Sequence, residues 1–317
     1  MNSIFNMQRS HNIMLTSSVP PSDPKLKNQD EQLNPNDKFY QELYKNQEYL
    51  LIHHLYHGFC FLVFFGILKF TLLLFCFAIW YLFVLIMPLF KNFFELKSKF
   101  KMFCYGIARN LIHLILFCLG IISVKINGNI EPKVRIFVSN HVSPLDYIIH
   151  FYGNLVTFTK IGSPSSFAKN LFTPIFDIFQ FKDKKLSYQI HNCASDPTLS
   201  PLLIFPEGKE TNGNAIGAFK KEVFKTDYLI QPISIQYHLH LTPRGFNTVY
   251  LGNDSYLYFF FRLLSIPFIT VELTYLSPLE IKYCQLDIDA KAQRAQLQIA
   301  NQIGVLAISK QEAIVKN

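Results

Sequence analysis

Residues 134–146, VRIFVSNHVSPLD, join an apolar run to the start of a helix. The run from Val134 to Ser139 is typical of a short strand. Ser143 is a good N-cap residue, and Pro144 is a good first residue of a helix. The stretch therefore predicts a strand-to-helix turn, which exposes His141 at the carboxyl edge of a sheet, where the sites of α/β proteins lie.

Further strand and helix patterns lie on both sides of this turn. The strand patterns occupy residues 123–126, 202–205, 230–237 and 268–276, and the helical patterns occupy residues 102–122, 256–264 and 289–306. Strands that alternate with helices in this way indicate an α/β fold. We expect a single domain over residues 102–310.

The composition favours a lipid partner. The 317 residues carry 30 Lys and Arg against 22 Asp and Glu, and half of them are apolar while only 16% are charged. Soluble domains are about 25% charged, so this shortfall argues against an ordinary cytosolic globule. The net charge of +8 suits lipid headgroups or nucleic acid. A nucleic-acid binder is not expected, because the aromatic residues concentrate in apolar stretches rather than among Lys and Arg.

The six cysteines give no sign of a metal site or a disulfide framework. They form no CxxC pair and have no His partner at zinc spacing. We expect them to be reduced.

Two segments precede the predicted domain. Residues 1–48 are polar and predict a disordered tail, which is not a signal peptide because the first 20 residues lack an apolar core. In residues 55–90 the only formal charge is Lys69. Residues 70–90 would reach about 30 Å as a helix, enough for one membrane span. One alternative is a hairpin that enters and leaves on the same side, and the lysines on both flanks favour it. The other is a buried core helix, which is less expected because such a helix seldom runs this long without charge.

Residues 102–122 are also apolar, but Arg109 and His113 interrupt them. This pattern predicts an amphipathic helix on the membrane surface or against the domain.

His141 and Asp146 are the first candidate pair. Across the turn, Asp146 could hold one ring nitrogen of His141 and leave the other able to accept a proton. Alternatively, Asp146 is only the far half of a capping box with Ser143. A second pair at the same spacing, His191 and Asp196, lies in a polar stretch with no strand before it, and we treat it as coincidence.

The second candidate segment is Phe205-Pro206-Glu207-Gly208, which ends a predicted strand with a restricted turn. Glu207 could accept a hydrogen bond from a substrate hydroxyl, and Gly208 would let a ligand approach the backbone closely. The alternative is a tight turn with a solvated carboxylate.

Together the two segments resemble the glycerophospholipid (1-acylglycerol-3-phosphate) acyltransferase superfamily. Asn140, His141 and Asp146 match its NHxxxxD motif, and FPEG follows about 65 residues later. Pro232 fits the family's fourth motif, whereas the middle motif, near residues 167–182, has Asp177 and Lys182 where the family has Gly and Arg. The resemblance covers roughly residues 102–280. It implies a mixed sheet flanked by helices and preceded by a membrane-embedded hairpin.

The resemblance also implies an activity, which is transfer of an acyl group from acyl-CoA to a lysophospholipid hydroxyl. His141 would be the general base, Asp146 would orient it, and backbone N–H groups after Ser143 would stabilise the oxyanion. The substrate-binding residues would be Asn140, Glu207, Gly208 and Lys209. No metal or bound cofactor is implied, and acyl-CoA is a co-substrate. The location would be the endoplasmic reticulum membrane or lipid droplets, with the domain facing the cytosol.

One departure from the family concerns the acceptor. Many members follow FPEG with Thr-Arg, and that Arg contacts the lysolipid phosphate; here the position holds Glu210, after Lys209. A Lys supplies a point charge but not the bidentate fork of Arg. Lysophosphatidate should suffer most, so a lysophospholipid with an esterified phosphate, or another acceptor, is as plausible.

The rival hypothesis is a catalytically idle, acyltransferase-shaped membrane scaffold. Within the superfamily, the apolar segment, SNHVSPLD and the TNG after FPE resemble the branch of ancient ubiquitous protein 1, at the endoplasmic reticulum and lipid droplets. Members of that branch carry ubiquitin-binding and E2-binding segments after the domain. Because this sequence stops at Asn317, we expect room for neither and little support for ubiquitin machinery as a partner.

Overall fold

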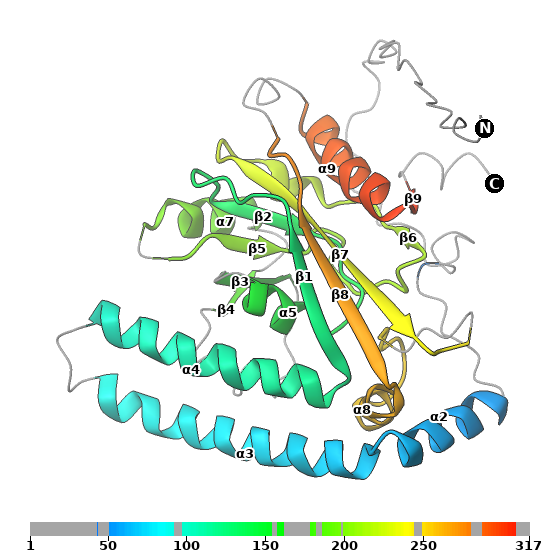
Figure 1. The fold of residues 1–317 in the computed structure, drawn as a ribbon. Coiled ribbons are helices and arrows are strands. Elements are labelled where there is room, and N and C mark those ends of the chain that lie inside the picture. Colours follow the sequence, from blue (N-terminus) through cyan, green and yellow to red (C-terminus); the bar gives the residue numbers. More distant parts are fainter. Residues whose placement is uncertain are drawn as a thin grey trace, which may run out of the picture.

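The computed structural model describes residues 43, 51–91, 97–153, 157–161, 178–181, 186–197, 199–243, 249–279 and 287–308 (Figure 1). The helices are α2 (Leu51–Val63), α3 (Gly66–Lys91), α4 (Lys97–Cys118), α5 (Asp146–Gly153), α7 (Leu186–Ser195), the 3-10 helix η2 (Lys221–Phe224), α8 (Tyr256–Ser265) and α9 (Ile288–Ile303). The strands are β1 (Ile121–Asn127), β2 (Ile136–Ser139), β3 (Thr157–Ile161), β4 (Ile178–Phe181), β5 (Leu202–Ile204), β6 (Ala215–Ile216), β7 (Ile230–His240), β8 (Phe268–Tyr275) and β9 (Leu306–Ala307).

Seven strands form one mixed sheet in the order β1-β8-β7-β2-β5-β3-β4. Neighbouring strands are parallel except β7 and β8, which pair antiparallel from Ile233 opposite Tyr275 to His240 opposite Phe268. Strands β6 and β9 form a separate parallel pair. The predicted mixed α/β fold is therefore confirmed. Strands β3 and β4 and helix α7 were not predicted.

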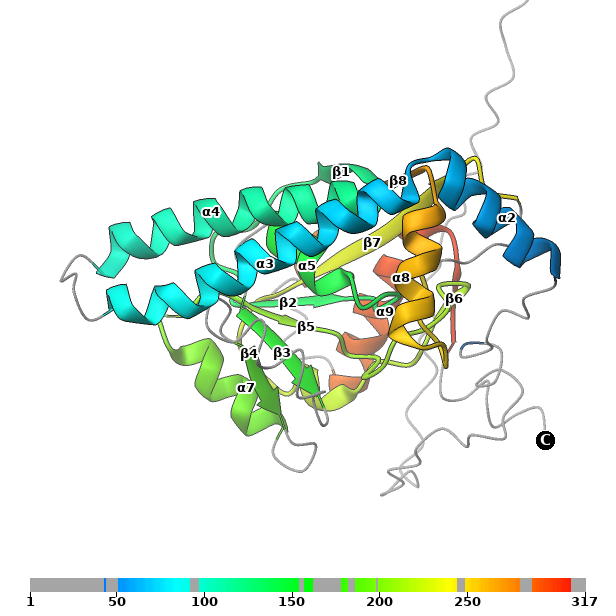
Figure 2. The same ribbon diagram turned by 90° about the horizontal axis from the view of Figure 1, so that it is seen from below.

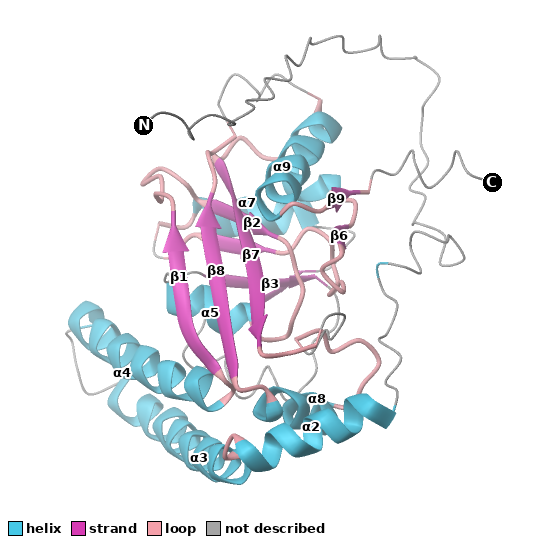
Figure 3. Cartoon of the chain, turned by 45° about the vertical axis from the view of Figure 1, so that its right-hand side comes forward, coloured by secondary structure: helices cyan, strands magenta, loops and turns pink. Residues whose placement is uncertain are grey.

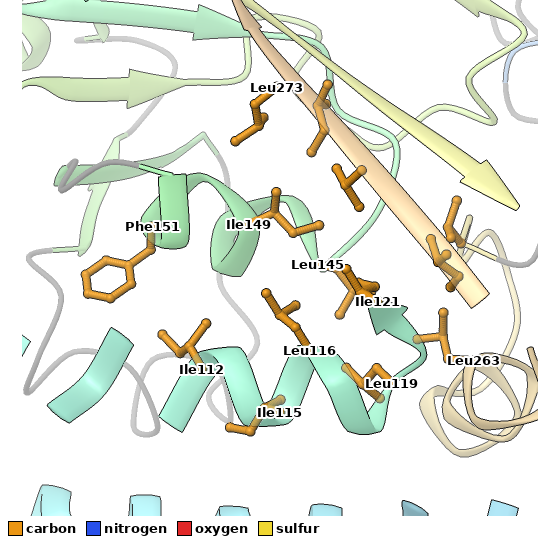
Figure 4. Close-up of a cluster of buried hydrophobic side chains, with 14 of the residues drawn as sticks. Ile112, Ile115, Leu116, Leu119, Ile121, Leu145, Ile149, Phe151, Leu263 and Leu273 are labelled. Atoms are coloured by element: carbon orange, nitrogen blue, oxygen red, sulfur yellow. The ribbon is translucent and has the colours of Figure 1, made fainter. Parts of the chain in front are cut away.

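Strands β2 and β5, in the middle of the sheet, are buried on both faces. Figure 3 shows helices packed around the sheet, as expected for strands of this kind. Ile136 and Val138 of β2 point to one side and pack with α7, η2 and α9. Phe137 points to the other side and packs with α4 and α5. On that side Ile112 and Leu116 of α4 lie near Ile149 of α5 (Figure 4). The sheet is thus held between two apolar cores, which fixes where the ends of β2 and β5 lie.

The apolar segment before the domain folds as two helices, α2 and α3, that meet at a sharp bend. None of the described helices alone has the length and apolar composition needed to cross a membrane. Residues 51–63 and 66–82 pass that test together, by length and composition only, but they are bent by 74°. The bend contains Phe65, whose φ is +58°. The predicted hairpin or span is therefore not confirmed.

Helix α3 lies alongside α4, and α2 lies against α8 (Figure 2). Leu73, Cys76 and Trp80 of α3 are buried against the domain. The Tyr56 hydroxyl of α2 donates to the Leu241 carbonyl at 2.5 Å, and the Lys69 ammonium of α3 donates to the Ile266 carbonyl at 3.2 Å. The bent pair therefore packs on the domain rather than standing away from it.

Helix α4 contains residues 102–118 of the predicted amphipathic segment 102–122 and packs against the domain, whereas the last two residues of that segment begin strand β1. Within the predicted tail, 1–48, the structure describes Leu43 alone, which is buried and accepts a hydrogen bond from the Asn212 N–H at 2.9 Å. The rest of that tail and most of the degraded middle motif, including Asp177 and Lys182, lie outside the described residues.

Candidate active site

Two neighbouring strands end at the same edge of the sheet. Strands β2 and β5 run parallel, with Val138 opposite Ile204. His141 follows three residues after Val138, and Glu207 follows three residues after Ile204. Because parallel strands share their carboxyl edge, the two motifs emerge side by side. The His141 N–H donates to Glu207 Oε1 at 2.9 Å, so the two candidate segments are in direct contact.

The carboxylate of Asp146 is bonded both to the His141 ring and to the turn. Its Oδ2 accepts from His141 Nδ1 at 2.9 Å and from the N–H groups of Val142 and Ser143 at 2.7 and 3.0 Å. The Ser143 hydroxyl in turn accepts from the Leu145 N–H at 3.2 Å, and the Ser143 carbonyl accepts from the Asp146 N–H at 3.1 Å, so Ser143 and Asp146 cap this helix start together. The two interpretations of Asp146 are therefore not alternatives, since one carboxylate caps the helix and holds the imidazole.

These capping hydrogen bonds change the expectation about the oxyanion donors. The N–H groups of Val142, Ser143 and Leu145 all donate within the turn. Pro144 has no N–H. The predicted oxyanion donors at this helix start are therefore occupied by the turn itself.

Tyr237 is a site residue that sequence reasoning missed. Its hydroxyl donates to Asp146 Oδ1 at 2.5 Å from strand β7, which lies beside β2. Burial, and next the charge of Asp146, hold the pKa of Tyr237 well above its usual value, so the hydroxyl stays a donor. The sequence predicted the strand that ends at Tyr237, but not which strand lies next to β2.

Glu207 braces the backbone around His141. Its Oε2 accepts from the Gly217 N–H at 2.8 Å, in addition to the His141 N–H on Oε1. The backbone carbonyl of His141 accepts a further hydrogen bond from the Thr211 N–H at 2.8 Å. Burial raises the pKa of Glu207 to about 7, although the two N–H donors oppose the rise. Both carboxylate oxygens are therefore used inside the fold, so we assign Glu207 to positioning His141 rather than to direct contact with the acceptor.

Two aromatic rings and the carboxylate of Glu210 surround the imidazole of His141. The Phe205 ring stacks on it with centroids 4.2 Å apart, and the Tyr147 ring meets it edge-on at 5.4 Å. His141 Nε2 lies 3.9 Å from Glu210 Oε1, and the Glu210 side chain is 25% exposed while that of His141 is 7% exposed. The Nε2 side of the ring is therefore the side nearer to solvent.

Opposing effects set the charge of His141. Burial disfavours the imidazolium, but the hydrogen bond and charge of Asp146, and then the charges of Glu210 and Glu207, outweigh burial and raise the pKa. A histidine with a raised pKa is a stronger base, and it loses that role as the pH falls.

The remaining predicted substrate-binding residues differ in their surroundings. The Asn140 amide donates to the Ile235 carbonyl at 3.0 Å and accepts from the Ile235 N–H at 2.9 Å, so it joins β2 to β7 and we assign it to the fold. Gly208 has a φ of +82°, and the Lys220 Cε lies 2.9 Å from where a Cβ would stand. Lys209 is exposed. Lys220 is thus a cation near FPEG that the sequence analysis missed.

Elsewhere, the second His/Asp pair stays apart from this site. His191 lies exposed on α7 and Asp196 follows that helix. Within the described part of the chain, no group of three or more His, Cys, Asp or Glu side chains is placed to hold a metal ion.

Known proteins of similar sequence include lipid acyltransferases and a lipid-droplet factor. No family model matches the chain. It is 31% identical over 171 residues to lysophospholipid acyltransferase LPEAT2 of Arabidopsis thaliana, which covers 50% of this chain and 30% of that protein. It is 27% identical over 191 residues to glycerol-3-phosphate acyltransferase 3 of Danio rerio, covering 57% and 41%. The lipid droplet-regulating VLDL assembly factor AUP1 of Homo sapiens is 25% identical over 206 residues, covering 62% and 47%.

The chain therefore spans less than half the length of these curated relatives. Among solved structures, the 1-acyl-sn-glycerophosphate (LPA) acyltransferase PlsC of Thermotoga maritima matches with a TM-score of 0.52 at 15% identity, over 75% of this chain and 95% of that one. At this identity the match shows the fold alone. The sequence similarities support the glycerophospholipid acyltransferase superfamily for this chain, with similarity both to its enzymes and to AUP1.

Proposed function

We propose that the protein transfers an acyl group from acyl-CoA to the hydroxyl of a lysophospholipid, with His141 as general base and Asp146 as its orienting partner. The observation that carries this proposal is the 2.9 Å contact between His141 Nδ1 and Asp146 Oδ2, with Nε2 toward the more exposed Glu210. The similarity to lipid acyltransferases supports acyl transfer in general. The donor, the acceptor and the residue roles are our proposal.

In this mechanism Nε2 of a neutral His141 takes the acceptor proton as the hydroxyl oxygen bonds to the thioester carbonyl carbon. The carbon–sulfur bond then breaks, and the imidazolium returns the proton to the sulfur of CoA. Asp146 fixes the tautomer with the proton on Nδ1 and stabilises the imidazolium. Tyr237 holds the other oxygen of Asp146, and Glu207 holds the backbone of His141. Lys209 and Lys220 are the nearby cations that a lipid phosphate would meet.

We also propose that the protein works on the endoplasmic reticulum membrane or on lipid droplets, with its domain on the cytosolic side. Helices α2 and α3 support this location, because large apolar side chains are exposed along both, among them Leu55, Phe59, Leu62 and Leu68. An exposed apolar surface of this kind marks a partner or membrane site. AUP1, whose name refers to lipid droplets, is among the relatives. The bent pair would lie in one leaflet, or cross as the predicted hairpin or span.

The second candidate is an acyltransferase-shaped scaffold without catalysis. The similarity to AUP1, which is named as an assembly factor, favours it. The carboxylate of Glu210 beside Nε2 favours it too, because a carboxylate there opposes the approach of a phosphate-bearing acceptor.

The deciding experiment uses the full chain in detergent with labelled acyl-CoA and a panel of lysolipids. We expect His141→Ala to lower the transfer rate by at least about a thousandfold. The matched control is His191→Ala, which removes the exposed histidine of the unrelated pair and should stay within about twofold of the parent rate. If the unaltered protein acylates no acceptor in the panel, the scaffold is the better account.

A further inference from the structure

Glu210 stands where the acceptor must approach. Its Oε1 is 3.9 Å from His141 Nε2, while Asp146 occupies the Nδ1 side of the ring. Of the two side chains, Glu210 is the more exposed, at 25% against 7%. A hydroxyl that donates to Nε2 therefore lies next to the Glu210 carboxylate.

The other two carboxylates near His141 face inward. Asp146 is fully buried and accepts four hydrogen bonds, and Glu207 is 8% exposed and accepts two from backbone N–H groups. Glu210 is the more exposed carboxylate, at 25%, and after burial its charge helps to raise the pKa values of Tyr147 and Tyr250. Glu210 is thus the carboxylate of this set whose field reaches the solvent side of the imidazole.

We propose that Glu210 determines the headgroup preference of the acceptor, disfavouring a bare phosphate and favouring a phosphodiester that carries an ammonium group. This inference rests on the proposed function. In a lysophospholipid, phosphate and reacting hydroxyl sit on nearby carbons of one glycerol, so the phosphate comes within a few ångströms of Glu210. A dianionic phosphate meets more repulsion there than a monoanionic diester, and an ammonium on the same headgroup is attracted to the carboxylate.

Lys220 adds a cation beside the FPEG turn. Its Nζ lies 3.3 Å from where a Cβ of Gly208 would stand, two residues before Glu210. A lysine supplies one point charge without the bidentate fork of an arginine. Lys220 and the exposed Lys209 offer point charges to a phosphate, and Glu210 offers a carboxylate to an ammonium, so this edge complements a zwitterionic headgroup better than a dianion. The matching substrate class is therefore a zwitterionic lysophospholipid, such as lysophosphatidylethanolamine or lysophosphatidylcholine.

The test measures initial rates on lysophosphatidylethanolamine, lysophosphatidate and monoacylglycerol, with the full chain in detergent. We expect the zwitterionic acceptor to exceed lysophosphatidate in kcat/KM by about tenfold or more, which is the effect of one extra charge about 6 Å away at a partly screened site. Glu210→Gln should reduce this ratio about tenfold, and Glu210→Arg should reverse it. The control Glu222→Gln makes the same change near Lys225, 3.9 Å away at the surface, and should leave the ratio unchanged.

Three results would overturn the inference. The unaltered protein prefers lysophosphatidate, or it prefers the uncharged monoacylglycerol, or Glu210→Gln slows all acceptors equally and leaves the ratio intact. The first two need no variant, so they hold even if a variant fails to fold. In each of them acyl transfer itself persists, whereas absence of transfer to every acceptor would count against the proposed function instead.

Discussion

The site at the ends of β2 and β5 and the bent helix pair α2–α3 differ in what holds them in place. Around His141, the ring, the backbone N–H and the backbone carbonyl each have a named hydrogen-bond partner. Along α2 and α3, the side facing the domain is packed, and the other side exposes residues such as Phe59 and Leu62. One region is complete within the chain, and the other presents an apolar surface to something outside it.

The two regions therefore differ in how strictly their contacts fix the geometry. Directional hydrogen bonds at the site allow one geometry, because a buried donor or acceptor without its partner is costly. Apolar contacts have no direction, so the outer face of α2–α3 suits any surface that excludes water. We therefore expect substitutions at the site to act mainly on catalysis, and substitutions on the outer face to act mainly on membrane binding.

Glu207→Gln should give the largest effect of the three substitutions that follow. A glutamine has one acceptor oxygen, so either the His141 or the Gly217 N–H would face an NH₂ group. We expect the transfer rate to fall about a hundredfold, because the imidazole loses its backbone brace. The rate is measured with labelled acyl-CoA, and Glu222→Gln is the control for loss of a surface carboxylate.

The same substitution has a signature in stability. In the fold the pKa of Glu207 is raised from 4.5 to about 7, so its contribution is fully present below pH 4.5 and is lost as the pH rises through about 7. This loss is on the order of 3 kcal/mol. Urea unfolding at pH 5 and pH 8 should therefore show a flatter pH dependence for Glu207→Gln than for the unaltered protein. Equal slopes in the two proteins would mean that Glu207 does not titrate in this way.

The sequence alone could predict the contacts of the site between residues that are close in the chain, but not those that depend on which strands lie side by side. Asp146 lies five residues from His141 within one turn, and the N-cap chemistry of Ser143 places it. The meeting of Glu207 with His141 follows from two strands ending at one edge. Tyr237 could not be assigned, because it depends on β7 lying beside β2, a long-range pairing that no local pattern encodes.

The apolar helices were predictable in composition but not in arrangement. A run without charge indicates burial or lipid, yet it does not specify where the chain bends. The bend next to Phe61 and Phe65 depends on contacts with distant parts of the chain, such as the ring of Phe261, 5.2 Å from that of Phe61. The local sequence contains no proline between α2 and α3, and Gly66 at the bend does not by itself show that the helix breaks there, because an isolated glycine is tolerated inside a helix.

Tyr237→Phe tests whether the hydrogen bond from Tyr237 to Asp146 positions the catalytic pair. The change leaves Asp146 Oδ1 without its 2.5 Å donor but keeps the ring in place. We expect kcat to fall about tenfold with little change in KM, because the imidazolium loses part of its support while substrate contacts remain. Unfolding should become easier by about 1 to 3 kcal/mol, since a buried acceptor loses its donor. The control is Tyr188→Phe, an exposed tyrosine on α7. Equal losses in the two variants would argue against a positioning role.

Leu62→Ser tests the exposed apolar face of α2 and should have the smallest effect on acyl transfer. Leu62 is 71% exposed, so its removal should change the free energy of unfolding by less than about 0.5 kcal/mol. If lipid covers this side chain, the lost burial is worth about 1.5 kcal/mol, which corresponds to roughly tenfold weaker binding. Co-sedimentation with vesicles of neutral lipid measures that binding, and acyl transfer to a detergent-dispersed acceptor should be unchanged. Tyr188→Ser removes a comparably exposed apolar side chain from α7 and serves as the control. Unchanged vesicle binding in Leu62→Ser would mean that α2 does not face the bilayer, and the outer face would then have to meet a protein.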